Sequence, residues 1–253
     1  IGEAELCLVY GFGKSSPGEL RTVMSLQLDP YYHVPLWPDS ISLAALQARA
    51  MLDSGVIGER DMAEVVARSR ANAQSNPNAQ LKGNPGIEQL LAEPTFVSPL
   101  RRHDCPPITD GASAMVIASA DAAARYCKRP AWVRGIDHRM ETGIIGARDL
   151  TRSPSTRIAG EKAGVARGRV DLAELHAPFS HQEIILRREL GLADSVPVNL
   201  SGGALAGNTM MAAGLDRIGY VAAQIMDGKA DRGVAHATSG PCLQQNLVAV
   251  LEA

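Results

Sequence analysis

The segment VPVNLSGGALAGNTMMAAGLDRIGYVAAQIMDGKAD, residues 196–231, carries the pattern that decides the fold. A short apolar run leads into a glycine-rich turn and then into an Ala- and Ile-rich helix that ends near Asp227-Gly228. Two further apolar runs follow, GVAHATSG (233–240) and NLVAVLE (246–252), with a short turn at GPCLQQ between them. Two apolar runs around a short turn predict a terminal antiparallel hairpin.

Upstream of this segment, strand and helix patterns continue to alternate. PAWVRGIDHRM (130–140) is typical of a strand, and SPSTRIAGEKAGV (153–165) has the spacing of an amphipathic helix. Residues 170–175 lead into HAPFSHQEIILRRELGL (176–192), which we interpret as a strand end, a loop and a long helix. Strands that alternate with helices predict a layered α/β fold with helices on a mixed sheet.

The first half of the chain changes character twice. AELCLVYGFGK (4–14) predicts a buried strand that ends at Gly11. Residues 15–104 contain a helix-like stretch over 41–52 and later become crowded with Asn, Gln, Pro and Gly, so we expect a helical insertion with long loops. The strand pattern returns at residues 114–118, and Ser119 can cap the helix that follows.

Composition excludes several classes of function. The 253 residues are 45% hydrophobic and 21% charged, as in ordinary globular proteins, and the net charge of −2 gives no case for nucleic acid. No run approaches the roughly 20 apolar residues of a membrane span. The four cysteines are widely spaced and predict neither a metal site nor a disulfide framework, so we expect a cytoplasmic protein with reduced thiols. Because the chain opens on Ile1, already inside a strand pattern, we also expect that an N-terminal part is missing.

Four stretches, in this order, resemble the thiolase superfamily, and its sterol-carrier-type or lipid-transfer group in particular: LVYGFGKSSPGEL (8–20), PLRRHDCPPITDGASAMVIAS (99–119), ELHAPFSHQE (174–183) and NLSGGALAGNTMMAAGL (199–215). The resemblance implies a thiolase fold, layered α-β-α-β-α with mixed sheets, plus a helical loop domain. It assigns residues 1–14 and 105–128 to the N-terminal thiolase half, 15–104 to the loop domain and 129–253 to the C-terminal half.

The resemblance implies chemistry at a carbon–carbon bond next to a CoA thioester. Such chemistry needs a nucleophilic cysteine, an acid/base group and oxyanion holes. The cysteine is implied to lie before Ile1. His176 matches the first position of the His-Asp-Cys-Phe motif of sterol-carrier-type thiolases, whereas Ala177 and Pro178 replace its Asp and Cys. An imidazole there can donate to a thioester oxygen or orient water; the alternative is a hydrogen-bonded histidine that fixes the loop.

The glycine-rich turn is the second matching element. Ser201, Gly202 and Gly203 fit a turn whose free N–H groups approach a substrate, or one that serves tight packing alone. Beyond it, Asn208 or Thr209 stands where the family has the histidine of Gly-His-Pro. Asn208 can donate a hydrogen bond to an oxyanion, but it cannot act as a base.

The terminal hairpin supplies further candidates. Thr238 or Ser239 falls nearest the family's second catalytic cysteine, and Cys242 in the following turn is an acid/base candidate or a plain turn cysteine. His236 either lines the cleft or satisfies a strand end. Tyr31, in the loop domain, either contacts an acyl chain or packs a Pro-rich loop.

Three functions remain open at this point. The first is a thiolase that cleaves a 3-ketoacyl-CoA, against which the missing histidine weighs. The second is a retro-aldolase for β-hydroxyacyl-CoA, as in steroid side-chain degradation, although no tyrosines stand at the matching C-terminal positions. The third is a catalytically inactive scaffold. All three imply acyl-CoA as ligand, no cofactor beyond the CoA of the substrate and a homodimer by default; a small OB-fold and zinc-ribbon partner protein can accompany the second and third.

Overall fold

A computed structural model describes residues 3–253 and is built around a four-stranded mixed sheet with the order β5-β8-β7-β6. β8 pairs antiparallel with both β5 and β7, whereas β7 pairs parallel with β6. The terminal hairpin and the mixed sheet that the sequence predicts are therefore confirmed. The strands are β5 (Trp132–Met140), β6 (Leu172–Leu175), β7 (Arg232–Ser239) and β8 (Gln245–Glu252).

Helices cover both faces of this sheet because successive side chains of a strand point to opposite sides. Val248 and Val250 of β8 join a core with α6 (Pro154–Ala163) and α7 (Ser180–Glu189). Ala249 and Leu251, the alternate residues, pack with α9 (Ala213–Met226). The helices predicted within residues 153–165 and 176–192 are thus present, and the Ala- and Ile-rich helix predicted to end near Asp227 is α9; each uses its apolar face to bury the sheet.

A separate two-stranded ribbon lies against α9. It consists of β1 (Leu6–Gly13) and β4 (Gly111–Ala118), paired antiparallel, and it leads into α5 (Ala120–Tyr126). Gly11 lies so close to α9 that an added Cβ would come within 3.2 Å of Leu215 Cδ1. The predicted cap of α5 is confirmed, since Ser119 Oγ accepts a hydrogen bond from the Ala122 N–H over 3.3 Å.

The prediction of a buried strand ending at Gly11 is wrong in two respects. β1 continues to Gly13, and its outer face is open, with Tyr10 and Phe12 67% and 66% exposed. Only the face that carries Val9 and Gly11 is covered. An apolar run indicates that a strand buries side chains, but it does not indicate whether one face of the strand or both faces are covered.

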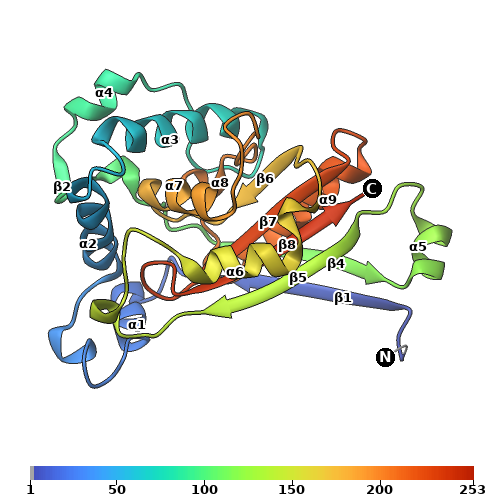
Figure 1. The fold of residues 1–253 in the computed structure, drawn as a ribbon, viewed down its shortest axis with the longest axis horizontal. Helices are drawn as coiled ribbons and strands as arrows, with labels where there is room; N and C mark the ends of the chain where they lie inside the picture. Colours follow the sequence, from blue (N-terminus) through green and yellow to red (C-terminus); the bar gives the residue numbers. More distant parts are fainter. Residues whose placement is uncertain (1–2) are drawn as a thin grey trace.

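The insertion is helical, as predicted. Figure 1 shows α2, α3 and α4 grouped with α7 and α8 on one side of the molecule. α2 confirms the helix expected over 41–52, and it begins where Asp39 Oδ1 accepts the Ser42 N–H over 2.7 Å. Ala48 and Met51 of α2 enter the same core as α7, so the insertion is anchored on the sheet domain. Its elements are α1 (Leu20–Leu26), α2 (Ser40–Asp53), α3 (Glu59–Asn72), α4 (Ile87–Ala92), β2 (Thr95–Val97) and β3 (Leu100–Arg101).

Short helical segments complete the described chain: α8 (Gly203–Ala206), η1 (Val34–Leu36), η2 (Ala73–Ser75), η3 (Arg102–Asp104), η4 (Ile145–Ala147), η5 (Val165–Arg167) and η6 (Met210–Ala212). Within residues 3–253, none of the helices combines the length and apolar character that crossing a membrane requires.

Candidate functional site

The end of β6 places His176 at the centre of a small hydrogen-bonded group. Its backbone N–H donates to the carbonyl of His236 on β7 over 3.2 Å, which continues the parallel pairing of the two strands. The Thr238 N–H donates to His176 Nδ1 over 3.4 Å, and His176 Nε2 lies 3.1 Å from Asn208 Oδ1. An amide oxygen only accepts hydrogen bonds, so Nε2 must carry the proton and donate a hydrogen bond to Asn208.

Burial of the ring keeps His176 neutral. The side chain is almost fully buried, and burial, followed by the charge of Arg217, lowers the pKa of His176 to about 4. Both ring nitrogens are occupied within the fold. The imidazole is therefore arranged to hold Asn208 in one orientation rather than to take up a proton at neutral pH.

Asn208 follows α8 and is fixed from a second direction. Its backbone N–H donates to Thr109 Oγ1 over 3.0 Å, and the Thr109 hydroxyl donates to Gln80 Oε1 over 2.7 Å. Because Oδ1 accepts from His176, the amide NH₂ group points away from the imidazole. Among the residues that the structure describes, no hydrogen bond takes up Nδ2 of Asn208, which leaves this group as a donor for a ligand.

Thr209 is engaged elsewhere. Its hydroxyl donates to Asp216 Oδ2 of α9 over 2.5 Å, which ties the chain that leaves Asn208 to the helix. Of the two residues that the sequence left open for the histidine position, Asn208 is the one whose side chain contacts His176.

The glycine-rich turn is held by a buried ion pair. Glu174 of β6 accepts hydrogen bonds from the Ser201 N–H and Oγ over 2.9 and 2.6 Å, and Arg217 Nη1 lies 3.3 Å from its second oxygen. Burial raises the pKa of Glu174, whereas Arg217 and Ser201 act in the opposite direction. The N–H groups of Gly202 and Gly203 donate to the Asn199 carbonyl and to Ser201 Oγ. All three N–H groups are thus used inside the fold, which favours the packing interpretation of this turn.

His236 belongs to a second polar group, next to α6. Asn246 Nδ2 donates to Ser155 Oγ over 2.7 Å and to the Leu243 carbonyl over 2.8 Å, so its Oδ1 faces His236 and accepts from Nε2 over 2.9 Å. Among residues 3–253, Nδ1 of His236 is buried with no hydrogen-bond partner. Burial lowers the pKa of His236 to about 3, so this ring is also neutral.

The other predicted residues lie in the turn between β7 and β8, at the end of β7 and between α1 and η1. Cys242 is buried in the turn between β7 and β8, its thiol donates to the Leu43 carbonyl over 3.3 Å, and burial raises its pKa to about 11. Ser239 is exposed at the end of β7, and Tyr31 is 84% exposed between α1 and η1. Within residues 3–253, no hydrogen bond joins any of these three side chains to His176 or Asn208.

Several residues of the site carry no sequence signal. Asn246 accepts a hydrogen bond from His236, which lies 10 residues away in the chain. Thr109 accepts one from the backbone N–H of Asn208, 99 residues away. Single polar residues of this kind are indistinguishable from surface residues until the fold brings them together. Over the same described residues, no group of three or more His, Cys, Asp or Glu side chains is placed to hold a metal ion.

No family model matches the chain. It is 31% identical, over 223 residues, to the acetyl-CoA acetyltransferase of Methanothermobacter thermautotrophicus. That match covers 79% of this chain and 58% of the archaeal protein, so the chain spans well under two thirds of that relative.

Two solved structures share the fold over nearly the whole chain. An Ltp2-ChsH2(DUF35) aldolase superposes with a TM-score of 0.78 at 20% identity and covers 99% of this chain and 73% of its own. Human mitochondrial 3-ketoacyl-CoA thiolase superposes with a TM-score of 0.74 at 18% identity, covering 99% and 72%. The chain has a thiolase fold and a sequence match to an acetyl-CoA acetyltransferase, and it belongs to the thiolase superfamily.

Proposed function

We propose that this chain binds an acyl-CoA thioester and takes part in making or breaking the carbon–carbon bond next to it, with Asn208 as a hydrogen-bond donor to the thioester oxygen. The observation that carries the proposal is the His176–Asn208 contact of 3.1 Å. It turns the amide donor of Asn208, one of the two residues that can stand at the family's histidine position, away from the imidazole.

Cleavage of this bond leaves its electron pair on the α-carbon of the thioester. The pair delocalises onto the thioester oxygen as an enolate, which is later protonated at carbon. A donor fixed before the reaction stabilises that oxygen more than water does, because it does not have to reorient. One such donor is worth roughly 10²–10³ in rate. His176 contributes by fixing the amide, and its own ring stays neutral.

A retro-aldolase acting on a β-hydroxyacyl-CoA, such as a steroid side chain, is the second candidate. It is favoured by the neutral amide donor of Asn208, because retro-aldol cleavage requires a donor for the enolate oxygen and a base that takes the β-hydroxyl proton, but no acyl-enzyme. The fold similarity to an aldolase complex is consistent with this choice. For this activity we propose an OB-fold and zinc-ribbon partner, and for either activity a homodimer.

The remaining site assignments are part of the same proposal. Cys242 is retained as the acid/base candidate of a thiolase reaction, with Ser239 and Tyr31 as substrate contacts. The division into thiolase halves (1–14 with 105–128, and 129–253) and a loop domain (15–104) is also proposed.

Turnover with two substrates tests the proposal. The purified protein, alone and with any co-purifying partner, is given a 3-ketoacyl-CoA plus free CoA, and separately a β-hydroxyacyl-CoA without CoA. CoA-dependent cleavage of the first establishes a thiolase. Release of a ketone or aldehyde from the second establishes the aldolase. Binding of acyl-CoA without turnover of either would reject both and identify a scaffold.

A further inference from the structure

The turn between β7 and β8 has an unusual backbone. Cys242 and Leu243 are consecutive residues with φ values of 53° and 59°, in the left-handed region that residues with a side chain seldom adopt. Two such residues in succession persist only where surrounding contacts impose the conformation. We therefore expect particular contacts of the fold to hold these two residues in the left-handed conformation.

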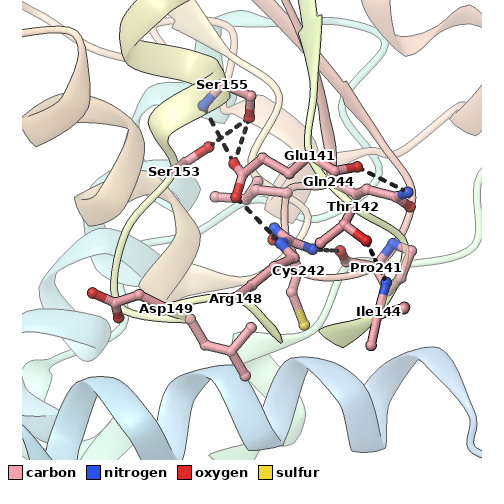
Figure 2. A network of polar contacts seen from close by, with 12 residues as sticks. Glu141, Thr142, Ile144, Arg148, Asp149, Ser153, Ser155, Pro241, Cys242 and Gln244 are labelled. Carbon is pink, nitrogen blue, oxygen red and sulfur yellow. Dashed lines mark hydrogen bonds and ion pairs between the residues drawn. The ribbon is translucent and has the colours of Figure 1, made fainter. Parts of the chain in front are cut away.

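Arg148 supplies the main contacts. Its Nη1 donates to the Pro241 carbonyl over 3.0 Å and its Nη2 to the Cys242 carbonyl over 2.5 Å, so one guanidinium holds two successive peptide groups (Figure 2). The side chain of Arg148 is 3% exposed. A planar fork of donors suits this geometry, whereas a lysine ammonium presents one charge at the end of a flexible stem.

Arg148 is itself held in place by Glu141, just after β5. Glu141 Oε2 lies 3.3 Å from Arg148 Nε, and Oε1 accepts hydrogen bonds from the hydroxyl and N–H of Ser155 over 2.6 and 3.3 Å. Figure 2 shows the carboxylate lying between the guanidinium and Ser155. The Glu141 N–H also donates to the Gln244 carbonyl over 2.9 Å, which joins β5 to the far side of the turn.

Both ends of the turn connect to the candidate site. Thr238 precedes it and donates its N–H to His176. Asn246 follows it and holds both His236 and the Leu243 carbonyl. A turn that relaxes would displace the groups that orient both histidines.

We propose that Arg148 is a positioning residue, which holds Cys242 and Leu243 in the left-handed conformation and thereby places Thr238 and Asn246 against the two histidines. Its effect on catalysis rests on the proposed function; its hold on the turn does not.

Cys242 reports directly on the turn. In the intact fold its thiol is buried against Leu43, so a maleimide reaches it only when the turn opens. Cys105 is a second buried thiol, outside the turn, and reports opening elsewhere in the same molecule. The experiment measures N-ethylmaleimide labelling of each cysteine by peptide mass spectrometry in the wild type, Arg148→Met and Arg148→Lys. Arg157→Met removes an exposed arginine that pairs with Glu161 on α6, and serves as the matched control.

We expect Arg148→Met to accelerate labelling of Cys242 at least about tenfold, because two hydrogen bonds from a charged donor are lost, with no change at Cys105. Arg148→Lys should lie in between, and Arg157→Met should match the wild type. Equal acceleration at both cysteines, or none at Cys242, would overturn the assignment whatever the protein catalyses.

If the protein does act on acyl-CoA, kcat of Arg148→Met should fall by roughly 10²-fold with little change in KM, because the substrate contacts remain while the reacting geometry shifts. A rise in KM alone would contradict the positioning role.

Discussion

His176 Nε2–H donates a hydrogen bond to Asn208 Oδ1 over 3.1 Å, across 32 residues of chain. The contact joins a residue that matches the sterol-carrier-type motif to one of the two residues that can stand where the family has the histidine of Gly-His-Pro. The histidine is not placed as a base, because its other nitrogen accepts the Thr238 N–H. The pair therefore forms one unit, in which the imidazole orients an amide and the amide is left to meet a ligand.

Mutation of the pair should reveal this dependence. We expect His176→Ala to reduce kcat by roughly 10²-fold and Asn208→Ala by a similar or larger factor. The double variant should lose little more than Asn208→Ala alone, because His176 acts through Asn208. The measurement is kcat for all four proteins, with thermal unfolding as a check that each is folded. Losses that multiply would show that the two residues act independently.

The pH dependence of turnover gives a second test of His176. With a pKa lowered to about 4, the ring stays neutral down to that pH, so its charge does not change near pH 6.5. We expect kcat/KM of the wild type and of His176→Gln to follow the same pH profile between pH 5.5 and 8. An inflection near pH 6.5 that is present in the wild type and absent in the variant would assign His176 an acid/base role instead.

Gly202 in the glycine-rich turn and Gly228 after α9 both have a positive φ. We expect their replacement by alanine to lower the free energy of unfolding by different amounts. An added Cβ at Gly202 (φ 93°) would lie 2.7 Å from the Cβ atoms of Ala206 and Ala73, whereas Gly228 (φ 71°) has open space around it. Gly228→Ala should cost about 1 kcal/mol, for the backbone conformation alone. Gly202→Ala should cost roughly 2–4 kcal/mol because overpacking adds to it. Urea unfolding measures both, and equal costs would mean that the turn relaxes freely.

Acid should destabilise the fold through its buried histidines. Burial lowers the pKa of His181 to about 3, whereas the unfolded chain binds a proton near pH 6.5. As the pH falls from 6.5 toward 3, the unfolded state gains a proton that the folded state does not, and the free energy of unfolding decreases.

The variant His181→Gln isolates this contribution. The amide replaces the Nε2 contact to Gln47 but does not titrate. Its free energy of unfolding should fall less steeply over this range than that of the wild type, by roughly 1.4 kcal/mol per pH unit. The free energy comes from urea unfolding at several pH values. Parallel curves for the two proteins would show that His181 does not contribute.

Local pattern was sufficient for most elements of the fold. α2 and α6 follow from apolar residues repeated with a helical period, and β7 and β8 follow from two apolar runs around a short turn. β1 shows the limit of such patterns. Its open outer face depends on what covers the β1–β4 ribbon, and no feature within residues 4–14 encodes that.

In the candidate site, too, the sequence predicted some features and the tertiary structure decided others. The sequence by itself identified the thiolase superfamily and marked His176 and Asn208, because ordered motifs and their departures are properties of neighbouring residues. Only the tertiary structure decided that these two side chains meet, that the N–H groups of the glycine-rich turn are already occupied, and that Arg148 holds the Cys242 turn across 94 residues of chain. Proton placement, burial and the conformation of a strained turn are set by partners distant in sequence, and those partners exist only once the sheet has brought β6, β7 and β8 together.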